Sequence, residues 1–336
     1  MDHPAGLPRP RPGPGQVRLR RVRHGRGPPG GGGVVAGPER DFVGHGPTAP
    51  LPRWPDGSLV AVNVVVNVEE GAEASWPDGE GNDGWGEYAL PIDPAVRDLG
   101  TEGHYEFGSR VGIWRLVRLF ERYDAPVTFG VCARALERNP PFAAWLRASG
   151  HDVLGHGYRW AEVTQMTEDE ERADLEHAMR VLPELVGRPV RGWYVRSFPS
   201  ERTRRLAAAH PELRYDSDAV NDELPYRTEV DGRPWLVVPY SKVHNDTRYF
   251  LPPTYATPRH FAESLIGAVD LLLEEARHGA GARLLTVGLH PRWSGQAARA
   301  VAVRDFLAWA TQQPEVSLVH RQQVADWWDE QVPAQS

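Results

Sequence analysis

The sequence predicts an α/β fold of the (β/α)-barrel type. From about Arg40 onward, short apolar runs alternate with segments of helical periodicity, which is the pattern of repeated strand and helix units. Polar and ionisable residues directly follow several apolar runs, as catalytic groups do at the C-terminal ends of barrel strands. With 336 residues, the chain is long enough for one large domain or two average ones.

The first 39 residues differ from the rest of the chain. They are rich in Pro, Gly and Arg and contain almost no periodic apolar residues, so they cannot bury enough surface to offset the entropy of ordering. We interpret residues 1–39 as a disordered tail and residues 40–331 as the catalytic domain. The tail lacks the continuous apolar core of a secretory signal; a transit peptide or a misassigned start codon are alternatives.

Six apolar runs predict strands. They are residues 59–68, 127–131, 152–154, 236–238, 284–289 and 316–319.

Helices are expected between these strands. The clearest one spans residues 167–187, where Thr167 and Glu170 have capping-box spacing and Gly187 ends the helix. Residues 112–123 and 259–278 also show helical periodicity. The segment 71–107 is expected to be a long loop rich in Gly, Pro, Trp and Asp, and a loop of that size after a strand is usually functional.

Composition argues against several classes of protein. A net charge of -7 argues against nucleic acid as the main partner, and the longest apolar runs are too short to cross a bilayer. The single cysteine, Cys132, rules out an internal disulfide framework and a multi-cysteine zinc site. We therefore expect a cytoplasmic protein that acts on a small molecule.

Four ionisable residues directly follow predicted strands. Glu69 and Glu70 follow the first strand, His156 lies between two glycines after the third, and His290 follows the strand at 284–289. If the strands converge in a barrel, two carboxylates and two imidazoles meet, and such a set can activate water and protonate a leaving group. The alternative for the two glutamates is a solvated strand end.

Further polar residues are candidates for ligand binding. Asp218 belongs to an acidic, turn-rich segment, which could also be only a solvated turn. Asn245, Asp246 and Arg248 in "HNDTRYF" suit a small polar ligand. Two further arginines either bind a carboxylate or amide oxygen of the ligand or form structural ion pairs; they are Arg110 and Arg159.

Taken together, these segments resemble the polysaccharide deacetylase superfamily. The motifs "RDFVGHG", "VNVVVNVEEG", "YEFGSRVG", "SGHDVLGHGYRW", "GRPVRGWY", "NDELP", "NDTRY" and "GLH" occur in the expected order over nearly the whole chain without its tail. The chain is most similar to the subgroup of bacterial cofactor-free allantoinases and cyclic imide hydrolases. The resemblance implies a distorted (β/α)7-type barrel, hydrolysis of a carbon–nitrogen amide bond and a homo-oligomer.

The resemblance also bears on whether the protein binds a catalytic metal ion. In ordinary members the first strand ends in two aspartates, one a base and the other a metal ligand, and two histidines four positions apart complete the metal triad. Here Glu69 and Glu70 stand at the aspartate positions, and His156 and Trp160 stand at the histidine positions. One histidine and one carboxylate fall short of the three protein ligands of a catalytic metal. No cofactor is therefore expected. A divalent metal such as zinc, held by Glu70 and His156, stays an alternative if another ligand rebuilds the site; candidates are His104, His290 and an acid of segment 216–218.

Without a metal, a side chain must activate the water and fixed donors must stabilise the oxyanion. We expect Glu69 or Glu70 to be the general base, His290 the general acid toward the leaving nitrogen, and His156 an oxyanion donor or partner of the base. Residues expected to contact the substrate are Arg110, Arg159, Trp160, Arg196, Asp218, Asn245, Asp246 and Arg248.

Two departures from the subgroup pattern concern the substrate. In "GWYVRSFPSERTRRL" Arg202 replaces an asparagine and the spacing grows by one residue, and Pro291 stands where a cysteine is typical. We expect a change of substrate rather than loss of activity. The leading hypothesis is hydrolysis of a cyclic amide, imide or ureide; the alternatives are a metal-dependent N-deacetylase and a non-catalytic ligand-binding relative.

Overall fold

The computed structural model describes residues 38, 40–83, 92–93, 95–251 and 254–332. The chain divides into two units, Met1–Ala36 and Gly37–Ser336. The first unit, and with it the proposed tail apart from Pro38, lies outside the described residues.

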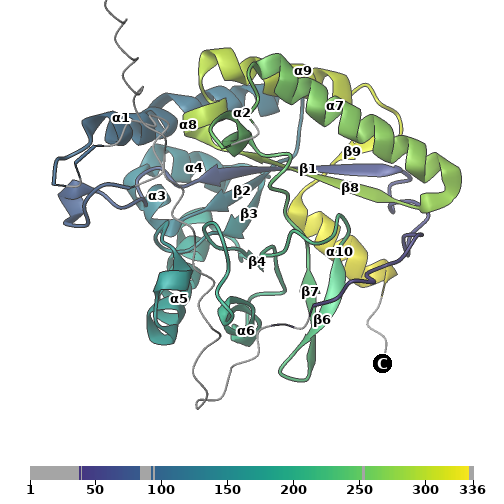
Figure 1. Cartoon of the computed structure of the whole chain (residues 1–336), viewed down its shortest axis with the longest axis horizontal. Helices are drawn as coiled ribbons and strands as arrows, with labels where there is room; N and C mark the ends of the chain where they lie inside the picture. The colour runs from purple at the N-terminus through teal and green to yellow at the C-terminus, as the bar shows by residue number, and fades with distance from the viewer. Residues whose placement is uncertain (1–37, 39, 84–91, 94, 252–253, 333–336) are drawn as a thin grey trace, which may run out of the picture. The chain divides into compact units, whose positions relative to one another are not determined.

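A curled, mainly parallel sheet forms the centre of the second unit (Figure 1). The strand order is β6-β7-β5-β4-β3-β2-β1-β8. Eight of the described strands run parallel: β1 (Val60–Val68), β2 (Thr128–Val131), β3 (Asp152–Gly155), β4 (Gly192–Trp193), β5 (Tyr215–Asp216), β7 (Arg233–Val237), β8 (Arg283–Leu289) and β9 (Val316–Leu318). β9 pairs with the start of β1, and β6 (Tyr226–Val230) forms an antiparallel hairpin with β7.

The barrel closes at a single bridge. Asn245, in the chain after β7, pairs with Gly288 of β8, and the Gly288 amide donates to the His244 carbonyl. Because this is the only backbone bridge between the two sides among the described residues, the barrel is distorted. The architecture confirms the predicted α/β barrel.

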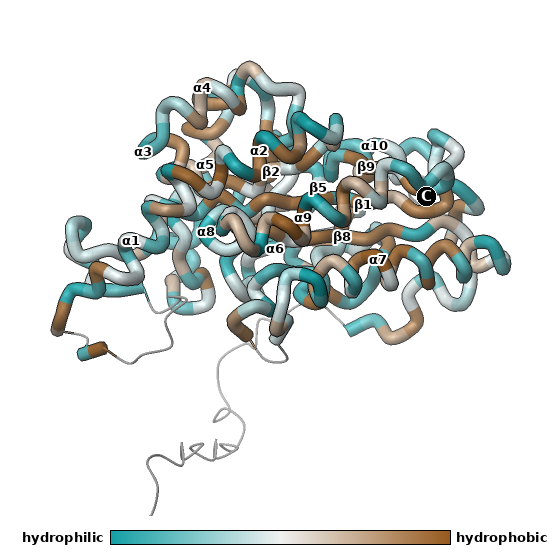
Figure 2. The backbone as a smooth tube through the Cα atoms, turned by 90° about the horizontal axis from the view of Figure 1, so that it is seen from above, coloured by the Kyte–Doolittle hydropathy of each residue, from teal (hydrophilic) through white to brown (hydrophobic). Residues whose placement is uncertain are grey.

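Helices cover the outside of the sheet. They are α1 (Leu99–Phe107), α2 (Ile113–Arg122), α3 (Ala133–Arg138), α4 (Pro140–Ala148), α5 (Glu168–Val186), α6 (Thr203–Ala209), α7 (Pro258–Glu275), α8 (Pro291–Ser294), α9 (Ala297–Ala310) and α10 (Arg321–Gln331). α7 and α9 pack side by side over β1 and β8 (Figure 1). In Figure 2 strands such as β8 are strongly hydrophobic, whereas the helices mix hydrophobic and hydrophilic residues.

All six predicted strands and all three predicted helices are present. The Thr167 hydroxyl accepts from the Glu170 amide, the Glu170 carboxylate accepts from the Thr167 amide, and Gly187 ends α5 in a left-handed conformation, as expected. The prediction of one long loop from 71 to 107 is wrong in part, because α1 lies within it. Glycines at both ends of the sequence "GHYEFG" hid this helix from a propensity argument.

β1 alternates between two environments. The side chains of Val60, Val62, Val64, Val66 and Val68 join the main hydrophobic core under the helices. The intervening positions include Asn63 and Asn67, whose amides bond to groups inside the barrel, and the series continues to Glu69. Successive side chains of a strand point to opposite faces, so one strand builds the core and also lines the barrel interior.

A column of polar side chains fills that interior. At its base lies Arg321 of α10, which is fully buried and donates to Asn63 Oδ1 at 3.0 Å, to Ser217 Oγ at 2.7 Å and to the Val238 carbonyl at 2.6 Å. Asn67 lies further along β1 and donates to the Tyr240 hydroxyl at 3.0 Å. The column leads toward Glu69, at the end of β1.

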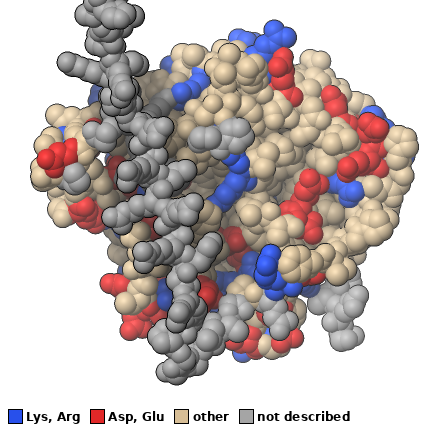
Figure 3. Space-filling model, in the orientation of Figure 1, with Lys and Arg blue, Asp and Glu red and all other residues tan. Residues whose placement is uncertain are grey.

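The outer surface has two features that bear on partners. On the face in Figure 3 basic and acidic side chains form small separate groups of both signs, so the described part of that face carries no continuous basic patch. Within the residues that the structure describes, no helix is both long enough and apolar enough to span a membrane.

Candidate active site

Glu69, His156 and His290 meet at the C-terminal ends of β1, β3 and β8. His156 Nε2 lies 3.2 Å from Glu69 Oε1, and His290 Nε2 lies 3.4 Å from the same oxygen. All three side chains are buried, with 5% or less of each residue exposed. The parallel strands therefore bring together residues that are up to 221 positions apart, as 290 minus 69 shows, and the predicted convergence is present.

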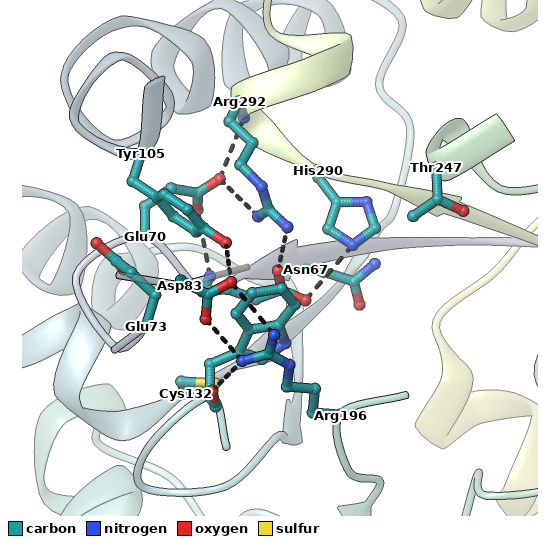
Figure 4. Close-up of polar contacts among 12 residues, drawn as sticks. Asn67, Glu70, Glu73, Asp83, Tyr105, Cys132, Arg196, Thr247, His290 and Arg292 are labelled. Atoms are coloured by element: carbon teal, nitrogen blue, oxygen red, sulfur yellow. Dashed lines mark hydrogen bonds and ion pairs between the residues drawn. The ribbon is translucent and has the colours of Figure 1, made fainter. Parts of the chain in front are cut away.

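The two adjacent glutamates have different environments. Glu69 lines the pocket described below, whereas Glu70 does not. Glu70 Oε2 accepts from the Glu69 amide at 3.2 Å, and Glu70 Oε1 accepts from the Arg292 amide at 3.1 Å (Figure 4). Of the two, only Glu69 is positioned to meet a substrate.

Arg292 is the residue that sequence reasoning missed. Its side chain is fully buried, with Nη2 2.7 Å from Glu69 Oε2 and Nη1 3.3 Å from Glu70 Oε1 (Figure 4). Its guanidinium also lies 4.8 Å from the ring centre of Tyr105 and 5.0 Å from that of Trp160. The only available signal was its place two positions after His290.

The charges in this cluster shift the pKa values of its members. Burial alone would raise the pKa of Glu69, but the positive charges of Arg292 and His290 outweigh it and hold that pKa well below its usual value. For Glu70, burial prevails over the attraction of Arg292 and the pKa is raised. Glu69 is thus the ionised carboxylate of the pair.

His290 is held in its protonated form. Burial would lower the pKa of its ring, but the carboxylates of Glu69 and Asp246 outweigh burial and raise the pKa to about 9. Asp246 Oδ1 lies 2.6 Å from His290 Nδ1, and Asp246 Oδ2 accepts from the His290 amide at 2.7 Å. Asp246 is fully buried and does not line the pocket, so it orients His290 rather than contacting a ligand.

His156 is fixed from two sides. Its Nδ1 lies 3.2 Å from the Tyr194 carbonyl, and its ring stacks on the Tyr194 ring with centres 3.8 Å apart. Both ring nitrogens therefore face acceptors, the Tyr194 carbonyl and the Glu69 carboxylate, and this favours His156 as a hydrogen-bond donor over His156 as a base.

A pocket of about 250 Å³ opens in front of these groups. It is lined by Asn67, Glu69, His156, Trp160, Tyr194, Val195, Ser197, Phe198, Pro199, Ser217, Asp218, Val220, Tyr240, Lys242, Asn245, Thr247, Leu251, His290, Arg292 and Trp293. Polar groups gather around Glu69, and many of the other lining residues are apolar. A larger cavity of about 880 Å³ near residues 38–49 contains none of the four catalytic candidates.

Several predicted binding residues line the pocket. Trp160, Asp218 and Asn245 do so directly. Asp218 Oδ1 accepts from the Val195 amide at 2.9 Å, and burial together with the Asp216 carboxylate raises the pKa of Asp218 to about 8. Arg196 lies behind this wall, with its guanidinium 3.6 Å from the Trp160 ring centre, and supports Trp160.

Three predicted arginines lie outside the pocket, which corrects their expected role as substrate holders. Arg110 is about three quarters exposed and lies 3.6 Å from the Glu106 carboxylate. Arg159 donates to the carbonyl groups of Ala72 and Glu73, which ties down the chain after β1. Arg248 donates to the Lys242 carbonyl. Periodicity and motif position show that such residues are near a site but not which way their side chains point.

Three other histidines, His104, His244 and His260, lie outside the pocket. His104 Nε2 is 2.9 Å from the Arg292 carbonyl, so it supports the segment that carries Arg292. His244 packs near Ser241, and His260 is an exposed residue in the first turn of α7.

The residues present do not fit a catalytic divalent metal. The Arg292 guanidinium contacts both Glu69 and Glu70, and so supplies positive charge where those carboxylates would otherwise bind a cation. Trp160 offers no lone pair at the position of the second expected histidine. Among the described residues, no group of three or more His, Cys, Asp or Glu side chains is arranged to hold an ion.

Comparisons with known proteins identify a family and several similar structures. The model of the polysaccharide deacetylase family matches residues 105–216. The crystal structure of a probable polysaccharide deacetylase from Pseudomonas aeruginosa PAO1 is similar, with a TM-score of 0.82 and 35% identity over 88% of this chain and 99% of that one. The crystal structure of PuuE allantoinase has a TM-score of 0.82 and 34% identity over the same shares. A Schizosaccharomyces pombe protein that carries the name polysaccharide deacetylase is 29% identical over 88% of this chain and 98% of its own length.

Proposed function

The chain belongs to the polysaccharide deacetylase family of hydrolases that act on non-peptide carbon–nitrogen bonds, and we propose that it opens a small cyclic amide, imide or ureide by hydrolysis. The observation that carries this proposal is the triad of Glu69, His290 and Arg292 at one end of a 250 Å³ pocket. It combines an ionised carboxylate, a protonated imidazole and a fixed positive charge.

In the proposed reaction Glu69 activates water. A water molecule bound in the pocket beside Glu69 passes a proton to its carboxylate while the oxygen adds to the ring carbonyl carbon. The lowered pKa keeps Glu69 ionised, although it makes Glu69 a weaker base. The neighbouring positive charges offset this, because they also stabilise the negative charge that develops on the carbonyl oxygen.

His290 then completes the proton transfer. When the carbon–nitrogen bond breaks, the His290 imidazolium donates its Nε2 proton to the leaving nitrogen, which remains attached to the other end of the opened ring. The proton held by Glu69 returns to His290 over the 3.4 Å between Nε2 and Oε1. One water is consumed and both residues regain their starting protonation states.

Arg292 takes the electrostatic role that a metal ion has in other hydrolases. It is a fixed cation in a water-poor site, where its charge acts strongly on an oxyanion. His156 is a second donor at the same end of the pocket. We infer that the reaction needs no divalent metal.

Two observations favour a ring over an acetylated sugar. A pocket of about 250 Å³ suits a small molecule rather than a sugar chain. PuuE allantoinase, whose name denotes hydrolysis of a small cyclic ureide, also resembles 88% of this chain.

Mass spectrometry of a substrate panel tests the proposal. The protein is incubated with hydantoin, dihydrouracil, succinimide, glutarimide, allantoin and N-acetylglucosamine oligomers, as purified and after chelation. We expect at least one cyclic compound to gain one water, and chelation to leave this unchanged. Acetate release from the oligomers that is abolished by the chelator would overturn the proposal in favour of a metal-dependent deacetylase.

A further inference from the structure

One wall of the pocket comes from the segment that departs from the subgroup pattern. Residues 195–199 follow β4, and Val195, Ser197, Phe198 and Pro199 all line the pocket. The segment therefore lies where it can select the group attached to a substrate ring.

The backbone of this segment adopts an unusual conformation. Ser197 has a φ of 55°, a left-handed conformation that is uncommon and strained for residues other than glycine. Such strain persists only where surrounding contacts enforce it. The Ser197 hydroxyl donates to Glu162 Oε1 at 2.9 Å, Arg196 Nε lies 3.0 Å from the same oxygen, and Lys242 Nζ donates to the Ser197 carbonyl.

These contacts present Phe198 to solvent at the pocket mouth. Phe198 is 65% exposed, and Val220, another lining residue, is 59% exposed. Lys242 Nζ lies 3.9 Å from the centre of the Phe198 ring and holds it by a cation–π contact. A single exposed apolar side chain needs no explanation, but two at the rim of one pocket indicate a surface for an apolar ligand group.

The lining of the pocket thus has two parts with different chemistry. Glu69, His290 and Arg292 form the reactive end, where an amide bond is attacked. Phe198, Val220 and Leu251 supply apolar surface elsewhere along the wall. A bare polar ring would leave that apolar surface in contact with water.

We propose that Phe198 binds an apolar side group on the substrate ring, so that the preferred substrates are cyclic amides with an aryl or alkyl substituent. This inference rests on the proposed ring-opening function. It excludes a polar side group, such as the ureido group of allantoin, as the preferred substituent.

The test compares two hydantoins. For hydantoin and 5-phenylhydantoin, kcat/KM is measured with the wild-type protein and with Phe198→Ala, Phe198→Leu and Phe42→Ala. The last is a matched control, because Phe42 is 79% exposed and does not line this pocket. We expect the wild type to favour the phenyl compound by about tenfold, the scale of a small apolar contact in a specificity pocket.

The variants test whether Phe198 causes the preference for the phenyl compound. Phe198→Ala should lose most of it through a higher KM for the phenyl compound, Phe198→Leu should keep part of it, and Phe42→Ala should keep all of it. Melting curves verify that each variant folds. Equal kcat/KM for both hydantoins in the wild type, or an unchanged preference in a folded Phe198→Ala, would overturn the inference.

A binding measurement separates failure of this inference from failure of the proposed ring-opening function. If the wild type opens no ring, calorimetric titration with the same two hydantoins decides the inference independently of turnover. Tighter binding of 5-phenylhydantoin that depends on Phe198 would support the apolar site although the function fails. Equal or undetectable binding of both compounds would overturn it.

Discussion

Arg292 places one positive charge in contact with two carboxylates that leave the same strand in opposite directions. Glu69 points into the pocket and Glu70 points behind it, and the guanidinium reaches both. A planar group with five donors can do this, whereas a lysine ammonium is a compact point charge. The same residue therefore holds the cluster together and, in the proposed reaction, also stabilises the developing oxyanion.

Removal of this charge should destabilise the fold. Arg292→Met leaves two carboxylates buried without their cation, and we expect the free energy of unfolding to fall by about 3–5 kcal/mol. Arg292→Lys should restore part of the stability but little of the activity. Chemical denaturation measures the change, with Arg118→Met on the exposed face of α2 as a control expected within about 0.5 kcal/mol. A stable, active Arg292→Met variant would refute this role.

The pKa of His290 predicts the pH dependence of turnover. A general acid must carry its proton, so kcat/KM should stay high up to about pH 9 and fall above it. Asp246→Asn removes one carboxylate that raises this pKa, and the alkaline limb should move to lower pH by roughly one unit. The control, Asp270→Asn on the surface of α7, should leave the limb in place.

The raised pKa of His290 also contributes to the free energy of unfolding. His290 binds its proton more tightly in the folded state than in the unfolded state, so its contribution is complete below the unfolded pKa of about 6.5 and is lost as pH rises through about 9. If the pH profiles of kcat/KM for the wild type and Asp246→Asn coincide, the titration of His290 does not cause the alkaline limb.

The sequence predicts some of these residues and not others for identifiable reasons. Glu69, His156 and His290 each follow an apolar run, and strand ends of a barrel meet, so their proximity was predictable. Arg292 was not, because arginine is almost never fully buried unless paired, and a pairing across 222 positions leaves no local pattern.

At the scale of elements, α1 and α2 form one helix with a wider turn between them. The residues Gly108–Gly112 form a π-helical turn that packs against α8. A Cβ on Gly112 would lie 2.1 Å from the Pro291 carbonyl oxygen, and one on Gly108 would lie 2.7 Å from Glu70 Oε1. The glycines of "EFGSRVG" thus allow the segment that carries His290 and Arg292 to approach closely.

Two glycine substitutions test this packing. Gly112→Ala must push the backbone of α8 away, so we expect a loss of roughly 2 kcal/mol or more in unfolding free energy and reduced turnover. Gly103→Ala is the matched change in α1, where a Cβ meets nothing within 4 Å; it should stabilise the protein by up to about 1 kcal/mol. Equal effects of the two substitutions would mean that the close approach of α8 is unimportant.

Element prediction succeeded for long patterns and for some short apolar runs such as 152–154, but it did not single out the fourteen-residue α9. The nine residues of β1 and the nineteen of α5 are unmistakable, while β4 and β5 have two residues each and cannot show a period. These two short strands exist because the barrel pairs them with longer neighbours, and tertiary pairing is not visible in a local window.

For the whole molecule, the polar interior of the barrel depends on one side chain from the last helix. Arg321 bonds to β1 through Asn63, to the chain after β5 through Ser217, and to the chain after β7 through Val238. It therefore connects three sides of a barrel that closes at a single backbone bridge.

Arg321→Met should weaken the entire barrel rather than one edge. Several buried acceptors lose their donor at once, and at about 1–3 kcal/mol for each unsatisfied group we expect a loss of at least 3 kcal/mol with a single cooperative transition. Hydrogen exchange should rise in β1, β5 and β7 together. Faster exchange confined to α10 would contradict this, and Arg118→Met serves again as the exposed control.

The position of Arg321 also has a consequence for synthesis on the ribosome. Asn63 of β1 emerges 258 residues before its partner Arg321. The inward amides of β1 therefore lack that donor while the middle of the chain is synthesised. Nascent chains arrested before Arg321 clears the exit tunnel should remain sensitive to protease. Chains arrested beyond it should become resistant, so that the barrel matures late and nearly all at once.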